Sequence, residues 1–135
     1  MDMRIKFPSG KRVDAEYKGF TVKTDQSIQN GGEGSAPAPF DLFLVSLGTC
    51  AGIYVLSFCL ERKIPTDDID IILRTEQDSQ KKMIGKITIE INVPKTFPVR
   101  YLAAVRQSAS LCSVKKHMQQ PPNFDIKTIV ISGDA

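Results

Sequence analysis

The stretch "DLFLVSLGTCAGIYVLSFC" occupies residues 41–59 and decides the fold of this chain. Asp41 is followed by eighteen residues without a charge, and Cys50 stands in the middle of them. The run is long and contains no proline, which predicts a helix from about Pro39 to Lys63. Pro39 suits the first turn of such a helix, and "KIP" after the run ends it.

A run of this length is also a candidate for a membrane-spanning helix. Its hydrophobicity is lowered by five small or polar residues, Ser46, Gly48, Thr49, Gly52 and Ser57. A helix that is apolar all round is equally typical of the buried centre of a protein. We therefore expect a core helix and no membrane. A chain of 135 residues has difficulty covering such a helix on every side, so we hypothesise a homodimer in which a second copy covers one face.

Short strands and a second helix are predicted on both sides of this central helix. Apolar and polar residues alternate in three runs within residues 3–22, which predicts an antiparallel meander, and a loop rich in glycine and proline follows at residues 30–39. Downstream, the pattern predicts strands near 68–75 and 87–93 with a polar turn, "EQDSQKK", between them. An amphipathic helix over 99–112, a short turn over 113–118 and a last strand over 124–132 complete the chain. The order β-β-β-α-β-β-α-β indicates a single α+β domain over residues 1–135.

Composition excludes several classes of function. The formal net charge is +3 and the lysines and arginines are scattered, so we expect no nucleic-acid partner. The N-terminal "MDMRIKFPSG" has no apolar region of the kind a secretion signal needs, and three cysteines are an odd number for a disulfide framework. Both features predict a cytoplasmic protein. His117 is the only histidine and no CxxC occurs, so we expect no metal site.

The three cysteines lie in different surroundings. Cys50 has Gly48 and Gly52 as neighbours in the predicted helix, which serve either close helix packing or the approach of a substrate to the sulfur. Cys59 is nine residues further on, a rotation of about 900°, so it points the opposite way and is expected in the core. Cys112 lies on the second helix and is able to meet Cys50 in space.

Two motifs carry a resemblance to a known family. "GGEGSAPAPFDLFLVSLGTCAG" at residues 31–52 resembles the loop and cysteine helix of the OsmC/Ohr family, which includes organic hydroperoxide reductases. "LCSVKKHM" at residues 111–118 resembles the second-cysteine motif of that family. The resemblance implies the OsmC-like α+β fold and an intertwined homodimer with the long helices at its centre.

The resemblance also implies a chemistry. Cys50 would match the cysteine that attacks a peroxide, and Cys112 the cysteine that resolves the resulting sulfenic acid to a disulfide. An external dithiol would then reduce the disulfide by exchange. No cofactor is needed for this cycle. The implied partners are a peroxide and a dithiol reductant.

The chain departs from the family pattern at several positions. Phe40 stands where the hydroperoxide reductases have a glutamate that holds a catalytic arginine, and Asp41 matches the acid of a broader OsmC-like branch. Of the two N-terminal arginines, Arg4 and Arg12, Arg12 beside the first predicted turn is the candidate catalytic arginine. Ser113 replaces a usual proline. A cysteine without a cationic neighbour stays largely protonated, and the dipole of its own helix offers little at a mid-helix position.

Two functions follow as expectations. The first is a thiol-dependent peroxidase for organic or hydrogen peroxides in oxidative-stress defence, with Cys50, Cys112 and Arg12 in catalytic roles. Lys115 and Lys116 either add positive charge near the cysteines or are ordinary surface residues. The alternative is a protein that binds a small apolar ligand in a dimer-interface cavity without turnover. Phe40 favours this alternative because it replaces a charged group with an apolar wall, and Phe40 and Asp41 are the expected binding residues.

Overall fold

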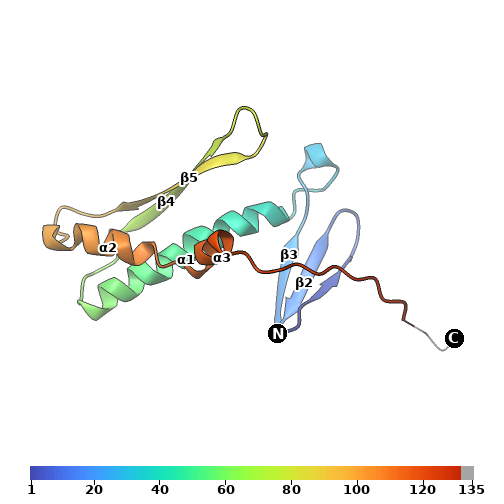
Figure 1. Cartoon of the computed structure of the whole chain (residues 1–135), viewed down its shortest axis with the longest axis horizontal. Coiled ribbons are helices and arrows are strands. Elements are labelled where there is room, and N and C mark those ends of the chain that lie inside the picture. The colour runs from blue at the N-terminus through green and yellow to red at the C-terminus, as the bar shows by residue number, and fades with distance from the viewer. Residues whose placement is uncertain (132–135) are drawn as a thin grey trace.

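The computed structural model describes residues 1–131 of the chain (Figure 1). Its longest element is the helix α1, Pro39–Glu61, which confirms the predicted core helix. Pro39 is at the first position of α1, where its missing N–H costs no hydrogen bond. At the other end the Arg62 guanidinium lies 3.6 Å from the centre of the Phe58 ring and donates to the Phe58 carbonyl at 3.1 Å.

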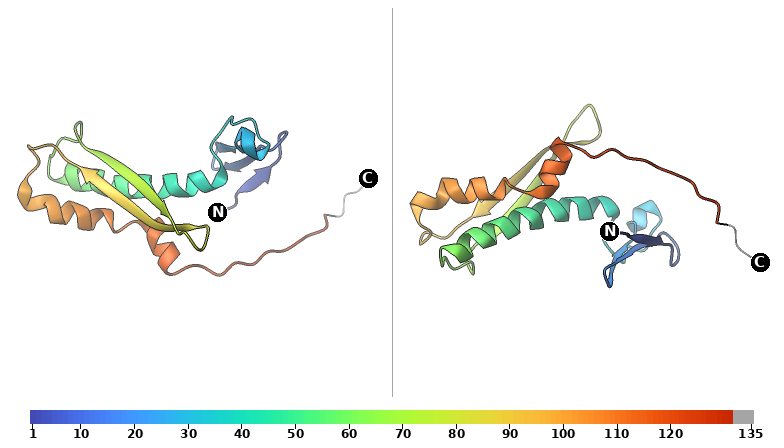
Figure 2. Two further views of the ribbon diagram at one scale, coloured as in Figure 1. Left: turned by 90° about the horizontal axis from the view of Figure 1, so that it is seen from above. Right: turned by 60° about the horizontal axis from the view of Figure 1, so that its bottom comes forward.

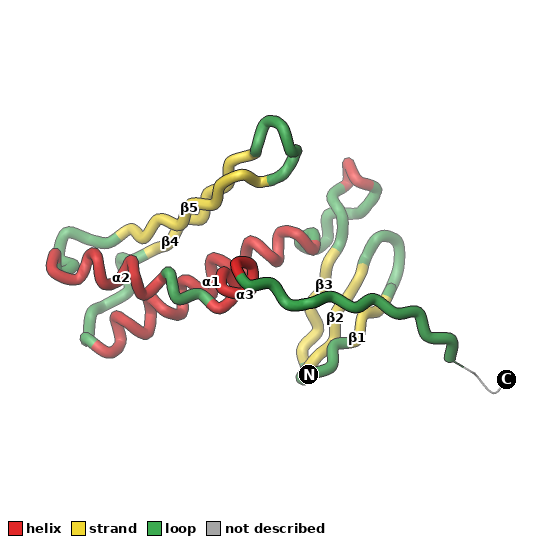
Figure 3. The backbone as a smooth tube through the Cα atoms, in the orientation of Figure 1, coloured by secondary structure: helices red, strands yellow, loops and turns green. Residues whose placement is uncertain are grey.

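A two-stranded antiparallel sheet packs along one side of α1. It consists of β4, Asp70–Gln77, and β5, Ile84–Asn92, and the polar turn predicted between them is present. The pairing places Leu73 opposite Ile89 and Ile71 opposite Ile91. The short 3₁₀ turn η2, Val99–Tyr101, leads into α2, Leu102–Ala109, which lies along α1 (Figure 3). The Ser108 hydroxyl fixes that contact by donating to the Tyr54 carbonyl at 3.1 Å.

The core lies where α1, α2 and this sheet meet. It is formed by Val55, Phe58, Cys59, Phe97 and Val105. Cys59 has no exposed surface, which confirms its predicted core position. By length and composition α1 is able to cross a membrane, but the core helix of a soluble protein passes the same test.

The predicted N-terminal meander is present and stands apart from this core. It consists of β1, Arg4–Lys6, β2, Val13–Tyr17, and β3, Phe20–Thr24, in the order β1-β2-β3, followed by the 3₁₀ turn η1, Ile28–Asn30. Figure 2 shows this sheet beyond the N-terminal end of α1, away from β4 and β5. Its apolar side chains are poorly covered, with Phe7 80% and Phe20 62% exposed. No element within residues 1–131 covers them.

The C-terminal region differs from the prediction in two ways. Residues 113–118, predicted as a turn, begin the helix α3, Ser113–Gln119. The last strand predicted over 124–132 is not formed within the described part, which ends at residue 131. Instead the segment extends away from the rest of the chain (Figure 1), and Ile126 and Val130 are at least 90% exposed. A strand needs a neighbouring strand to satisfy its backbone groups, and none of the strands in residues 1–131 pairs with this segment.

The accessible surface of the chain is large for its mass. It amounts to 11017 Å² for 14.9 kDa. A compact monomer of this mass exposes about 7,000 Å², so the excess is about 4,000 Å². The excess surface belongs to three parts of the chain, namely the isolated N-terminal sheet, the uncovered side of α1 and the extended C-terminal segment.

Candidate active site

The two cysteines singled out by the sequence lie together. Cys50 is at the middle of α1, and Cys112 is the N-cap residue of α3, which follows α2 closely in the chain. Hydrogen bonding between the two thiols is one of the causes that set both their pKa values. Both are free thiols, Cys50 partly exposed and Cys112 buried. The arrangement therefore brings a second thiol to the one candidate nucleophile.

The backbone of α3 stabilises the thiolate of Cys50. A hydrogen bond from the Val114 N–H is the largest cause that lowers the pKa of Cys50, and burial opposes it. The Cys112 side chain and the Ser113 N–H lower that pKa further. These N–H groups belong to the first turn of α3, where backbone donors have no partner within the helix. The sequence interpretation looked only at the dipole of α1 and missed this source of stabilisation, because it read residues 113–118 as a turn.

Cys112 is shifted the opposite way. Burial raises its pKa, and the hydrogen bond and charge of Cys50 raise it further. The Lys115 N–H works against this rise, and lies 3.5 Å from the Cys112 sulfur. Two neighbouring groups whose pKa values are pushed apart divide the roles of base and acid between them. Here the thiolate is favoured at Cys50 and the protonated thiol at Cys112.

Gly48 and Gly52 face away from this sulfur pair. Each is two residues from Cys50 and therefore about 200° of helical rotation away from it. A Cβ at Gly48 would lie 3.8 Å from the Leu73 side chain, and one at Gly52 would lie 3.9 Å from Ile71. Of the two roles considered for these glycines, the structure supports close packing of α1 on β4.

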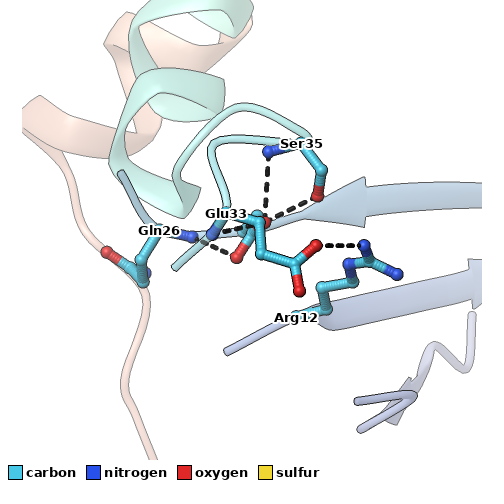
Figure 4. A network of polar contacts seen from close by, with 5 residues as sticks. Arg12, Gln26, Glu33 and Ser35 are labelled. Carbon is cyan, nitrogen blue, oxygen red and sulfur yellow. Dashed lines mark hydrogen bonds and ion pairs between the residues drawn. The ribbon is translucent and has the colours of Figure 1, made fainter. Parts of the chain in front are cut away.

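Arg12 is not near Cys50 in the same chain. It follows the turn between β1 and β2, and its Nη2 lies 2.7 Å from Glu33 Oε2 in the glycine-rich loop (Figure 4). Arg12 is also not among the groups that shift the pKa of Cys50. Arg4 is on β1, in the same separate sheet. The predicted arginine therefore has a carboxylate partner, supplied by Glu33 and not by residue 40.

A buried carboxylate that the sequence interpretation missed shapes this loop. Asp25 is 1% exposed and accepts hydrogen bonds from the N–H groups of Gln26 at 2.7 Å, Glu33 at 3.3 Å and Ser35 at 3.1 Å, and from the Ser35 hydroxyl at 2.6 Å (Figure 4). The Ser35 hydroxyl is the largest cause that lowers its pKa, to about 2. Gly32 is required beside it, because a Cβ there would come within 2.1 Å of the Gln26 carbonyl oxygen.

The predicted binding residues lie at the start of α1. Phe40 and Asp41 are nine or ten residues before Cys50, which is about 15 Å along a helix. Phe40 is exposed and packs on Phe43 with ring centres 5.5 Å apart. Together with Met118 both rings line a cavity of about 670 Å³. Asp41 is exposed in the first helical turn. In the same chain neither residue reaches the sulfur of Cys50.

The remaining predicted groups are at the surface. The side chains of Lys115 and Lys116 are exposed on α3. Within residues 1–131, no cluster of three or more histidine, cysteine, aspartate or glutamate residues is arranged to hold a metal ion.

A family comparison decides the relationship that this arrangement indicates. The model of the OsmC-like protein family matches residues 32–127, which include both cysteines, the glycine-rich loop and α1. The chain belongs to the OsmC-like family. No curated protein matches its sequence.

Solved structures share the fold of this OsmC-like chain at low sequence identity. A protein from Psychrobacter arcticus, described provisionally as an osmotic stress induced and detoxification response protein, has a TM-score of 0.71 at 18% identity, over 84% of this chain and 85% of that one. An organic hydroperoxide resistance protein OsmC from Legionella pneumophila has a TM-score of 0.54 at 16% identity, over 88% and 90%. A protein from Vibrio cholerae, described provisionally as an organic hydroperoxide resistance protein with captopril in one active site, has a TM-score of 0.51 at 15% identity, over 90% and 86%.

Proposed function

We propose that this OsmC-like protein is a thiol-dependent peroxidase that reduces organic or hydrogen peroxides. The observation that carries the proposal is the placement of Cys50, whose pKa is lowered, against the protonated thiol of Cys112. Membership of the family supports it. So do the names of the fold relatives from Legionella pneumophila and Vibrio cholerae, which refer to organic hydroperoxide resistance.

The proposed cycle begins with the thiolate of Cys50. Its sulfur attacks one oxygen of the peroxide, a sulfur–oxygen bond forms and the oxygen–oxygen bond breaks. The other oxygen leaves as an alkoxide or hydroxide and takes up a proton to give an alcohol or water. The peroxide is thereby reduced, and Cys50 is oxidised to a sulfenic acid.

Cys112 completes the cycle. Its sulfur attacks the sulfenic sulfur of Cys50, and the hydroxyl group leaves with the thiol proton as water. The resulting disulfide is reduced by an external dithiol, which becomes a disulfide itself and restores both cysteines as thiols. The raised pKa of Cys112 suits this order, because burial and the charge of Cys50 disfavour the thiolate of Cys112 until Cys50 is oxidised.

The functional unit in this proposal is an intertwined homodimer. The excess of about 4,000 Å² per chain amounts to about 8,000 Å² for two copies, which exceeds the roughly 2,000–5,000 Å² in total that obligate dimers commonly bury and so leaves ample surface for an intertwined interface. The partner would cover the exposed side of α1 and the separate N-terminal sheet. Arg12 would then reach Cys50 of the other copy, held by Glu33 in the place that the family gives to a glutamate at residue 40. The single domain and a cytoplasmic location complete the proposal.

A peroxidase assay tests it. Wild type, Cys50→Ser and Cys59→Ala are each given cumene hydroperoxide and excess dithiothreitol. We expect loss of turnover in Cys50→Ser and retained turnover in Cys59→Ala, because Cys59 is enclosed in the core. Cys112→Ser is assayed without dithiothreitol, which would itself reduce a sulfenic acid, and should consume one equivalent of peroxide and stop with Cys50 as a sulfenic acid. The proposal is wrong if wild type consumes peroxide no faster than Cys50→Ser.

A further inference from the structure

Another cavity has Cys112 of the cysteine pair among its lining residues, does not include Cys50, and has an apolar wall. It encloses about 380 Å³ and lies between α1, β5 and the helices α2 and α3. Ile87, Ile89 and Ile91 line it together, because alternate residues of a strand share one face. Leu47 of α1 and Met118 of α3 extend the same wall. This volume falls in the range of small-molecule sites, which runs from roughly 300 to 1,000 Å³.

Two cations line the same cavity. They are Arg106 of α2 and Lys115 of α3, and no carboxylate lines the cavity with them. Within residues 1–131, every ion pair involves other side chains, so neither cation has a carboxylate partner there. An apolar wall with two such cations is complementary to a ligand that has an anionic head and an apolar tail.

We propose that this cavity binds a medium-chain carboxylic acid, with the carboxylate at Arg106 and Lys115 and the alkyl chain along the three isoleucines. Carboxylates are the preferred partners of a guanidinium, which presents two parallel N–H groups to them. An alkyl chain gains by removing apolar surface from water. The site differs from the one expected at Phe40 and Asp41, and it requires a charge on the ligand. It does not depend on peroxide reduction at Cys50.

The test is calorimetric titration of the full chain with three probes. Decanoate carries both the head and the tail, decanol carries the tail with an uncharged head, and butyrate carries the head with a short tail. We expect decanoate to bind at least about tenfold more tightly than either of the others, because a hydrogen bond to a charged group contributes roughly one power of ten or more. Higher ionic strength should weaken the binding of decanoate and leave decanol unchanged.

Variants assign the head group to its residues. Arg106→Gln and Lys115→Gln should each weaken decanoate about tenfold, whereas Lys116→Gln is the control, since Lys116 is exposed on the same helix and does not line the cavity. Arg106→Lys keeps the charge and should retain most of the affinity. Binding should persist in Cys50→Ser, which separates this site from the peroxidase proposal. The inference is overturned if decanoate does not bind, if decanol binds equally well, or if both glutamine variants bind as wild type does.

Discussion

The thiol of Cys112, at the N-cap of α3, lies against the thiol of Cys50 at the middle of α1, and hydrogen bonds from the backbone of α3 lower the pKa of Cys50, whereas burial raises that of Cys112. This relationship explains how a cysteine in the middle of an uncharged helix can have a lowered pKa. α1 has no charged residue between Asp41 and Glu61 and so supplies no cation of its own. The N–H groups of a second helix take that role.

The first prediction concerns the reactivity of Cys50. Because hydrogen bonds lower its pKa, alkylation by iodoacetamide should rise with pH at a lower pH for Cys50 than for free cysteine. Cys112 should respond at a higher pH, since burial raises its pKa. Mass spectrometry of peptides alkylated over a pH series measures both. If Cys50 is alkylated with the pH dependence of free cysteine, α3 does not activate it.

The second prediction concerns Ser113, which stands where the family usually has proline. Ser113→Pro removes one of the N–H groups that lower the pKa of Cys50 and should therefore raise that pKa. The fold should tolerate the change, since proline suits the first helical position and Cys112 already has an extended ψ of 122°. Ser113→Ala keeps the N–H and is the matched control. Equal alkylation rates at neutral pH in the two variants would show that this donor does not act on Cys50.

The third prediction concerns acid stability. Asp25 has a pKa of about 2 in the folded chain against an ordinary 3.8, so its carboxylate stabilises the fold fully above the ordinary value. That contribution should disappear as pH falls from about 4 towards 2. Urea unfolding over this pH range should show the free energy of unfolding of wild type falling between about pH 4 and 2. Asp25→Asn should be less stable than wild type at neutral pH, and its free energy of unfolding should fall less over the same range. Asp68→Asn, at an exposed position, is the control and should keep the pH dependence of wild type. A wild type and Asp25→Asn with parallel pH profiles would contradict this role.

The fourth prediction concerns assembly. Wild type should sediment at about twice 14.9 kDa, because one chain leaves so much apolar surface uncovered. Ile53 is 54% exposed on α1, and Ile53→Asp should abolish the dimer by burying a charge in the interface. Lys81→Glu, in the turn between β4 and β5, should leave the dimer unchanged. A monomeric wild type, or a dimeric Ile53→Asp, would rule out a dimer built on this face.

The sequence allowed the elements with strong periodicity to be predicted. An uncharged run of this length specified α1, and strict alternation specified β5. The strand predicted over 124–132 does not form within the described residues, because an alternating pattern indicates which side chains are to be buried but does not supply a strand to pair with, and no strand of residues 1–131 lies beside it. α3 was missed because its seven residues are too few to show a helical period.

The candidate site was predictable in part. Cys50 and Cys112 came from motifs, and their contact requires the tertiary placement of α2 and α3 on α1, which no local pattern contains. Asp25 gave no signal, since a single aspartate before a loop is common and its burial depends on the fold of residues 26–35. Glu33 as the partner of Arg12 depends on the same loop.

The central claim is that Cys50 and Cys112 form one redox pair. Its most direct test is peptide mapping after wild type has reacted with one equivalent of cumene hydroperoxide in the absence of reductant. We predict a Cys50–Cys112 disulfide, with Cys59 still a free thiol. Cys50 left as a sulfenic acid, trapped with dimedone, while Cys112 remains a thiol would contradict the claim.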